Sequence, residues 1–444
     1  MSLSSAIGAA KSGLTTTSIQ AELVARNIAN ASTSGYTRKS ANLMTTAGGG
    51  VYVATIDRQV DSMLNRLDRA NISKLAALET VADGMKAYTD FLGQPDDETS
   101  PVASLASLKE ALITLSGGVS DRSAQLAVIS AARNMASNLN SLSDTLSSIG
   151  GEVEMNIRYD VAELNTALYD IAALNKKITA GGAGSDLVSQ YQDQMDQLLQ
   201  TVAGYVDIQT VTDNQGIVTV LTGGGVELVS ASSVHDVTYD PGTGRLRAGQ
   251  NDMTPGNSSR SFTAGSLAGL FELRNGTLPS WNGELQGIKD ALVDGFAQAA
   301  PLGNDAGLFI EAAGKLAVNP AVDPSAGGDA GLLQSGGGDL APGDGSIVNA
   351  MLGVFSTPQG GSASLTEMVA TIVAGQQQLR ADKDAAVTLT STTAATISAS
   401  RENLQGVNVD DELQRLLLVE QSYAANAKVL SSVTEMLDSL LQAV

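Results

Sequence analysis

Two stripes of mainly apolar residues, one at each end of the chain, repeat in steps of three and four positions. The N-terminal stripe is formed by Leu3, Ile7, Ala10, Leu14, Thr17, Ala21, Val24 and Ile28. The C-terminal stripe is formed by Val409, Leu413, Leu416, Glu420, Tyr423, Ala427, Leu430, Thr434, Leu437, Leu441 and Val444. Such steps average 3.5 residues, the period of a helix whose seam faces another helix. Each end is therefore predicted to be a helix that packs on helices, either within one chain or between copies.

A longer stripe of the same kind occupies the middle of the N-terminal half. Between Ala132 and Ile178 every apolar step is three or four residues, which predicts one helix from Arg122 in a coiled-coil-like rod. Gly150-Gly151 is the expected bend in this helix, because glycine weakens helices. Further apolar patterns predict helices over 57–92, 102–115, 186–203, 265–299 and 364–405.

The hydrophobic period changes after residue 206. Val and Ile residues there are separated by the turn sequences Asp213-Asn214-Gln215-Gly216 and Asp240-Pro241-Gly242, a pattern typical of short strands. The predicted fold is mainly α with a β-rich insertion: the N- and C-terminal halves form a long helical bundle, and a small β domain lies at its distal end. The predicted segments are terminal helices 1–33 and 409–444, rod segments 34–206 and 364–408, the β-rich domain 207–264, and a helix with a Gly/Pro-rich irregular stretch over 265–363.

Composition narrows the possible functions. The chain has 444 residues, of which 43% are hydrophobic and only 4% aromatic, which suits several domains built from helix pairs. A net charge of −21 without a basic stripe argues against nucleic-acid binding. No apolar run reaches the roughly 18 residues that a membrane span needs. Lys11 interrupts the first apolar stretch, so a Sec-type signal is not expected. The chain is expected to stay in the cytoplasm or to be exported without a cleavable signal.

Candidate chemistry is sparse. The chain has no Cys and one His, which argues against disulfides and a structural zinc site. His235 precedes Asp236, but no nucleophile motif lies nearby, so His235 is interpreted as a surface or turn histidine. Glycine clusters at 181–184, 223–225 and 336–338 lack phosphate-loop spacing, and the Asp-rich loop 323–344 lacks an EF-hand register. No catalytic residue, metal or cofactor is predicted.

Motifs on the terminal stripes resemble the signatures of flagellar rod, hook and hook-associated proteins. The N-terminal motifs are Ser12–Leu23, Asn27–Asn30 and Thr33–Arg38, and the C-terminal motifs are Gly406–Glu412, Gln421–Tyr423, Asn426–Val429 and Glu435–Asp438. Gly35-Tyr36-Thr37-Arg38 is similar to the first hook-associated, or hook–filament junction, proteins, whereas a hook subunit would usually carry Gly-Phe-Lys. Internal motifs that resemble the same family are Ala172–Ile178, Gly223–Gly225, Gly265–Arg274, Leu278-Pro279 and Leu316–Pro320.

Two features depart from that family pattern. Val24-Ala25-Arg26 replaces the small, Ser/Asn-rich lead into the Asn27–Asn30 motif. The chain also looks short for the family, which implies that an outer domain is reduced or missing.

The resemblance implies a non-enzymatic structural subunit of the bacterial flagellum. Such a subunit leaves through the flagellar type III export channel without a cleavable signal and joins the extracellular hook to the filament. The implied partners are further copies in a tubular ring, hook subunits, the second hook-associated protein and an export chaperone on the C-terminal helix, with no nucleic acid and no membrane. A hook or distal-rod subunit is the alternative, and an enzyme or binding module that uses His235 in the β region is a remote one.

The resemblance also places an assembly interface on both terminal helices. In the N-terminal part it is expected at Leu3, Ile7, Ala10, Leu14, Ala21, Val24, Asn27, Ile28, Asn30, Gly35 and Tyr36. In the C-terminal part, which would also bind the chaperone, it is expected at Leu413, Leu416, Leu417, Tyr423, Asn426, Leu430, Leu437 and Leu441.

Overall fold

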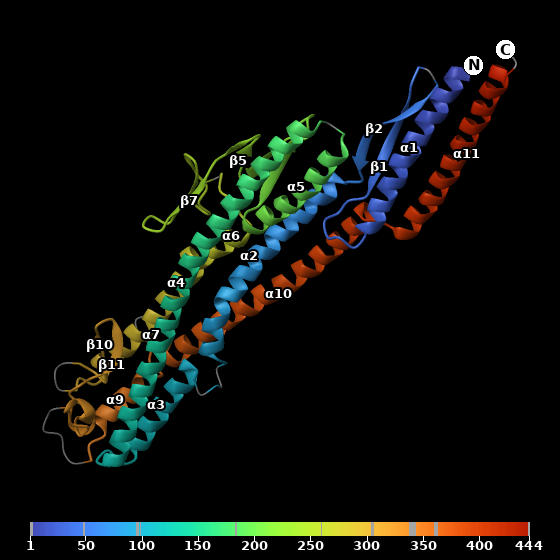
Figure 1. The fold of residues 1–444 in the computed structure, drawn as a ribbon. Helices are drawn as coiled ribbons and strands as arrows, with labels where there is room; N and C mark the ends of the chain where they lie inside the picture. The colour runs from blue at the N-terminus through green and yellow to red at the C-terminus, as the bar shows by residue number, and fades with distance from the viewer. Residues whose placement is uncertain are drawn as a thin grey trace. The chain divides into compact units, whose positions relative to one another are not determined.

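The chain forms two compact units, each assembled from separate stretches of sequence (Figure 1). The computed structural model describes residues 3–47, 49–94, 97, 99–182, 184–258, 260–302, 306–336, 343–358 and 363–442. Unit 1 holds Met1–Ala77, Arg158–Ala268 and Leu389–Val444, and unit 2 holds Leu78–Ile157 and Gly269–Thr388. Both ends of the chain therefore belong to unit 1.

Helices dominate the described residues, as the sequence predicts. They are α1 (Leu3–Ala29), α2 (Ser62–Leu92), α3 (Pro101–Ser116), α4 (Arg122–Gly181), α5 (Asp186–Tyr205), α6 (Ser266–Glu272), α7 (Leu278–Ala299), α8 (Leu332–Ser335), α9 (Ser346–Val354), α10 (Leu365–Gln405) and α11 (Val409–Gln442). A π-helical turn, Leu273–Thr277, joins α6 to α7, and a short 3-10 turn spans Pro324–Ala326.

The strands are short and all pair antiparallel. They are β1 (Lys39–Thr45), β2 (Val51–Arg58), β3 (Ile208–Thr212), β4 (Val218–Thr222), β5 (Glu227–Ser230), β6 (Ser233–Val234), β7 (Val237–Asp240), β8 (Arg245–Ala248), β9 (Asn251–Asp252), β10 (Phe309–Ala312) and β11 (Lys315–Val318). β1–β2 and β10–β11 are hairpins, β3 to β6 form a four-stranded sheet, and β7 to β9 form a three-stranded sheet.

The longest helix, α4, has 60 residues and follows the predicted stripe. The helix is not broken at Gly150-Gly151, where the sequence suggests a bend. Ile149 and Val153 on either side are buried, so packing of the stripe outweighs the weak helix propensity of glycine.

The β region lies elsewhere than expected. The sequence predicts it at the far end of the bundle, but β3 to β9 belong to unit 1, together with both chain ends. The reason is that the chain has already returned to unit 1 within α4 before the strands begin. Asn165 and Asn175 of α4 fix the strands: each side chain exchanges paired amide bonds of 2.8–2.9 Å with the backbone of Val237 or Val218.

Unit 2 has its own aromatic core. The rings of Tyr88 and Trp281 lie 4.9 Å apart, and Phe296 contacts Phe309 and Phe355 edge-on at 5.5 and 5.9 Å between centroids. Such edge contacts add to the stability gained from burying the rings. This core contains the chain's single Trp and three of its six Phe residues.

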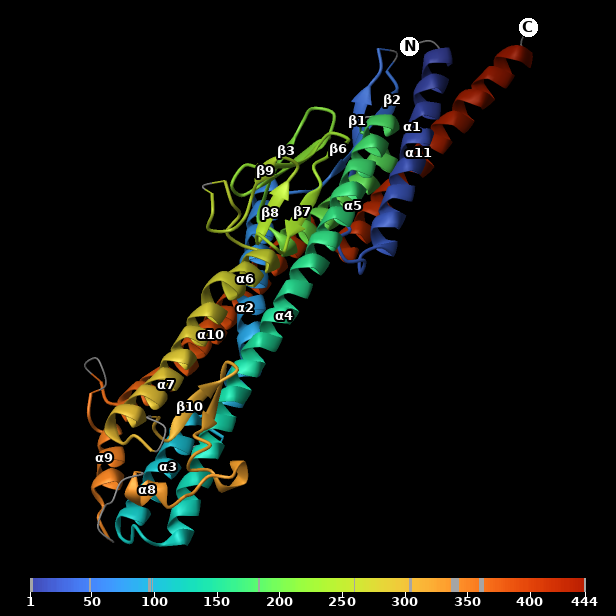
Figure 2. The same cartoon turned by 90° about the vertical axis from the view of Figure 1, so that its left-hand side faces the viewer.

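The end of unit 1 that contains the termini is a helix pair with a hairpin. Figures 1 and 2 both show α1 and α11 side by side and antiparallel, so that the N- and C-termini lie near each other, with β1 and β2 along α1. The Thr16 hydroxyl donates to the Val51 carbonyl at 3.1 Å, and the Ser12 hydroxyl accepts from the Val51 amide at 3.1 Å. These bonds attach β2 to α1.

Candidate functional site: the terminal helix pair

The terminal helices α1 and α11 pack on each other within one chain. The periodicity alone leaves open whether their stripes pack within one chain or between copies. The side chain of Asn426 on α11 sits against Gly13 on α1, so closely that a Cβ at Gly13 would lie 2.8 Å from its amide atoms. On the same face of α11, Val433 is buried and Leu416, Leu430 and Leu437 are partly buried. We call this face the inner stripe.

The start of α11 is fixed by a buried carboxylate. Glu412 is fully buried, and it accepts bonds from Arg38 Nε at 2.7 Å and from Asn27 Nδ2 at 3.0 Å. Asn408 caps the helix by accepting from the amide of Asp410 at 3.0 Å, as its side chain favours. A buried charge needs such partners, because leaving water is costly. Glu412 therefore holds α11 on the segment that follows α1.

Asn27 connects three parts of this junction. It donates to the Lys39 carbonyl and accepts from the Lys39 amide, at 2.9 and 3.2 Å, and its Oδ1 also accepts from the Tyr36 hydroxyl at 2.8 Å. With the bond to Glu412, every polar group of its fully buried side chain has a partner. The Asn in the predicted interface thus supports the fold of its own chain.

A second buried carboxylate lies on α5. Asp193 accepts from Lys39 Nζ at 2.6 Å, Arg58 Nε at 2.8 Å and the Thr37 hydroxyl at 2.5 Å, and Arg58 also pairs with Asp196. The adjacent residues Arg38 and Lys39 therefore bind carboxylates on two different helices. Arg38 binds Glu412 of α11, and Lys39 binds Asp193 of α5. The start of β1 couples the terminal helix pair to the rest of unit 1.

Tyr36 lies between these groups. Its ring covers the Lys39 ammonium, which is 4.1 Å from the ring centroid. Burial, followed by the nearby charge of Asp193, raises the pKa of Tyr36 to about 12. Gly35 just before it has φ +77°, and a Cβ there would collide with the Gln197 side chain. The Gly-Tyr pair of the motif is thus explained by local geometry.

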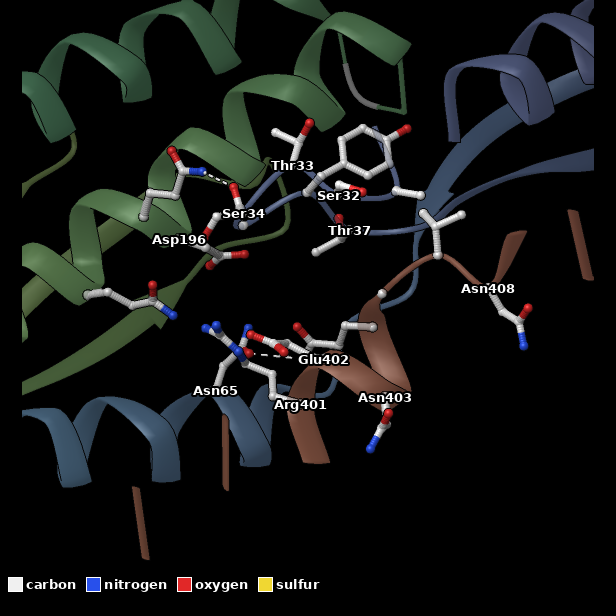
Figure 3. Close-up of a pocket in the computed structure, with 18 residues that line it drawn as sticks. Ser32, Thr33, Ser34, Thr37, Asn65, Asp196, Arg401, Glu402, Asn403 and Asn408 are labelled. Atoms are coloured by element: carbon white, nitrogen blue, oxygen red, sulfur yellow. Dashed lines mark hydrogen bonds between the residues drawn. The ribbon is translucent and has the colours of Figure 1, made fainter. Parts of the chain in front are cut away.

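A polar pocket of about 600 Å³ opens beside this junction (Figure 3). The turn 31–37 forms one wall, and the end of α10 with the linker 406–408 forms another, so both connections to the terminal helices border it. Arg401 pairs with Asp68 at 2.9 Å, and Gln197 donates to the Ser34 carbonyl at 2.9 Å. The pocket walls are therefore held by their own contacts.

A neighbouring face of α11 is exposed and apolar. It carries Leu418, Val429, Met436 and Leu440, whose exposed fractions are 65%, 48%, 51% and 56%. These positions repeat at the same spacing as the inner stripe, but further round the helix. We call them the outer stripe. No described residue covers it, so α11 has two apolar faces, of which α1 occupies one.

The predicted interface residues divide between these environments. Within the chain, Ala10, Val24 and Asn27 are buried, whereas Leu3, Ile7, Leu14, Ala21, Ile28, Asn30, Gly35, Tyr36, Leu416, Asn426, Leu430 and Leu437 are partly exposed. Leu413, Leu417, Tyr423 and Leu441 are exposed. Val444, the last residue of the predicted stripe, lies outside the described residues.

Sequence reasoning missed the outer stripe and the buried carboxylates. A second apolar repeat on α11 could have revealed the outer stripe, because it has the same period. Glu412 lies in a recognised motif, but nothing in the sequence pairs it with residues almost 400 positions earlier. Arg26, which departs from the family pattern, pairs with Asp186 at the start of α5.

The other candidate sites show only structural contacts. His235 Nε2 lies 3.2 Å from Glu227 Oε1 at the surface. In loop 323–344, Asp323 binds Arg133 and Asp329 binds Arg122, while residues 337–342 lie outside the described part. Within that part, no cluster of His, Cys, Asp and Glu has the arrangement of a metal site. No described helix has the length and hydropathy of a membrane span.

Comparison with known proteins shows which family the chain resembles. The model of the flagellar hook-associated protein FlgK helical domain matches residues 88–308. The model of the flagellar basal body rod FlgEFG protein C-terminal region matches 400–443, and that of the flagella basal body rod protein matches 7–37. The chain is similar to flagellar hook-associated protein 1.

Relatives in the FlgK family are distant. Flagellar hook-associated protein 1 of Salmonella typhimurium is 27% identical over 325 residues, which cover 68% of this chain and 58% of that protein. The Bacillus subtilis protein of the same name is 22% identical over 501 residues, covering 98% and 96%. A solved structure, the flagellar hook junction protein FlgK from Burkholderia pseudomallei, matches with a TM-score of 0.47 at 20% identity, covering 56% of this chain and 47% of that one.

Proposed function

We propose that this chain is a structural subunit of the bacterial flagellum that joins hook to filament, as its similarity to FlgK proteins suggests. The observation that carries the proposal is the outer stripe, since the chain itself leaves this apolar face of α11 uncovered. Fully burying one such side chain is worth roughly 1.5–3 kcal/mol. Contact between copies would bury the stripe, with α1 and α11 of each copy packing as one piece.

The proposal includes location and partners. The subunit would act outside the cell, in a ring of copies between the hook subunits and the second hook-associated protein. Before assembly an exposed apolar stripe favours aggregation, so an export chaperone that covers α11 fits the same surface. We propose no catalytic role.

Electron microscopy of a strain that lacks this chain tests the proposal. A junction subunit predicts completed hooks without filaments. The alternative, a hook or distal-rod subunit, predicts that no hooks form, and that result would overturn the junction assignment.

A further inference from the structure

A second pocket in unit 1 has an unusual cation in its wall. The pocket has a volume of about 1010 Å³ and is lined by β2, the start of α2, α5, β3 and the turn after β3. Its lining combines the apolar side chains of Met63, Met195 and Leu199 with the guanidinium groups of Arg66 and Arg69. None of these residues belongs to the terminal helix pair.

Arg69 is buried without an acidic partner. Only 9% of the residue is exposed, and its Nη2 donates to the Thr210 hydroxyl at 3.1 Å. Its Nε is buried and has no hydrogen-bond partner, and no described carboxylate lies within 4 Å of the guanidinium. Burial lowers the pKa of Arg69, although the nearby charges of Asp196 and Asp68 act to raise it without forming an ion pair, and an arginine stays charged at any working pH. A buried, unpaired charge is unfavourable and is stabilised by an anion.

Neighbouring arginines of the same unit show what Arg69 lacks. Arg401 and Arg58 each hold a carboxylate, at 2.9 and 2.8 Å. Arg66, one helical turn before Arg69, also has no described carboxylate within 4 Å, and residues three apart share one side of a helix. Two unpaired cations thus line one pocket in a chain of net charge −21.

We infer that this pocket binds a carboxylate carried on an apolar stem. The guanidinium fork of Arg69 matches a carboxylate in shape and charge, and the methionine and leucine walls match an aliphatic stem. Asp57, Asp196 and Asp213 also line the pocket and would repel a multiply charged ion, such as phosphate, more strongly than a carboxylate with a single charge. The carboxylate comes either from an acidic side chain of a second copy or from a free carboxylic acid.

Calorimetric titration of the full chain with hexanoate tests the inference. Hexanoate should bind saturably, whereas hexanamide, which has the same stem without the charge, should bind at least tenfold more weakly. Arg69→Gln should weaken hexanoate binding about tenfold or more, the effect of losing a charged hydrogen bond. Because a buried variant can disturb folding, Arg66→Gln, an exposed change, should also weaken binding. Arg158→Gln makes the same charge change outside the pocket lining and should bind like the wild type.

Sedimentation of the same variants distinguishes the two sources. If a second copy supplies the carboxylate, hexanoate and Arg69→Gln will both weaken self-association. If a free acid is the ligand, self-association will not change while hexanoate still binds. The inference is overturned if hexanoate binds no better than hexanamide, or if Arg66→Gln and Arg158→Gln bind it equally. The junction role could stand in that case, because it depends on the outer stripe.

Discussion

At the residue scale, the junction depends on two buried carboxylates that bind adjacent cations. Glu412 holds Arg38 and Asn27, and Asp193 holds Lys39 and Arg58. Because Arg38 and Lys39 are consecutive, one short segment connects both carboxylates. The motif residues at the end of α1 therefore set where the terminal helices attach.

Replacing Glu412 with alanine should destabilise this junction. The change leaves Arg38 and Asn27 without their partner, and breaking a buried ion pair costs about 3–5 kcal/mol. Glu420→Ala removes an exposed carboxylate from the same helix and should change stability by less than about 0.5 kcal/mol. Urea unfolding, followed by circular dichroism, measures both variants. Equal stability of the two would contradict the proposed importance of Glu412.

Tyr36 should make stability sensitive to alkaline pH. Its pKa of about 12 lies above the value near 10 of an unfolded tyrosine, so the folded chain holds the proton more tightly. The resulting stabilisation is complete below pH 10 and is lost as pH rises through 12. We expect a loss of about 1–2 kcal/mol between pH 10 and 12 that Tyr36→Phe lacks. Parallel pH curves for wild type and variant would refute this.

At the element scale, two glycines of α1 meet different surroundings. A Cβ at Gly13 would press on Asn426, whereas a Cβ at Gly8 would meet nothing within 4 Å. Gly8→Ala should therefore stabilise the chain by up to about 1 kcal/mol through helix propensity. Gly13→Ala should gain less, because Asn426 must move away from α1. Thermal unfolding should show this difference, and Asn426→Ala should abolish it.

The elements could be read from the sequence better than their partners. The stripes of α1, α4 and α11 predicted these helices because a seven-residue repeat is a local signal. The β region was recognised by its change of period, but its place in unit 1 depends on where the chain turns back. The inner and outer stripes of α11 have the same period, so only the structure shows which of them α1 covers.

At the scale of the whole molecule, charge should oppose assembly. A chain of net charge −21 repels its copies, and added salt screens this repulsion. Self-association of the purified chain should therefore strengthen between about 50 and 500 mM sodium chloride. Light scattering at fixed protein concentration measures it. Weaker association at high salt would indicate that ion pairs, and not the outer stripe, join the copies.

The terminal helices should be dispensable for folding of the remainder. Unit 2 has its own core. The rest of unit 1 keeps α5, the start of α2, and the strands that Asn165 and Asn175 of α4 bind. A chain without residues 1–33 and 410–444 should stay folded and monomeric but fail to join hooks. Loss of its helical circular dichroism signal would show instead that the terminal pair belongs to the core of the subunit.

The central claim is that the outer stripe joins copies while the inner stripe holds α1. The most direct measurement compares Met436→Ser on the outer stripe with Leu430→Ser on the inner one, in a strain that lacks the wild-type chain. The account predicts that Met436→Ser unfolds like the wild type and is exported, yet electron microscopy shows few filaments on its hooks. Leu430→Ser should lower the stability of the isolated chain. Normal filaments with Met436→Ser, and with Leu440→Ser added to it, would contradict the account.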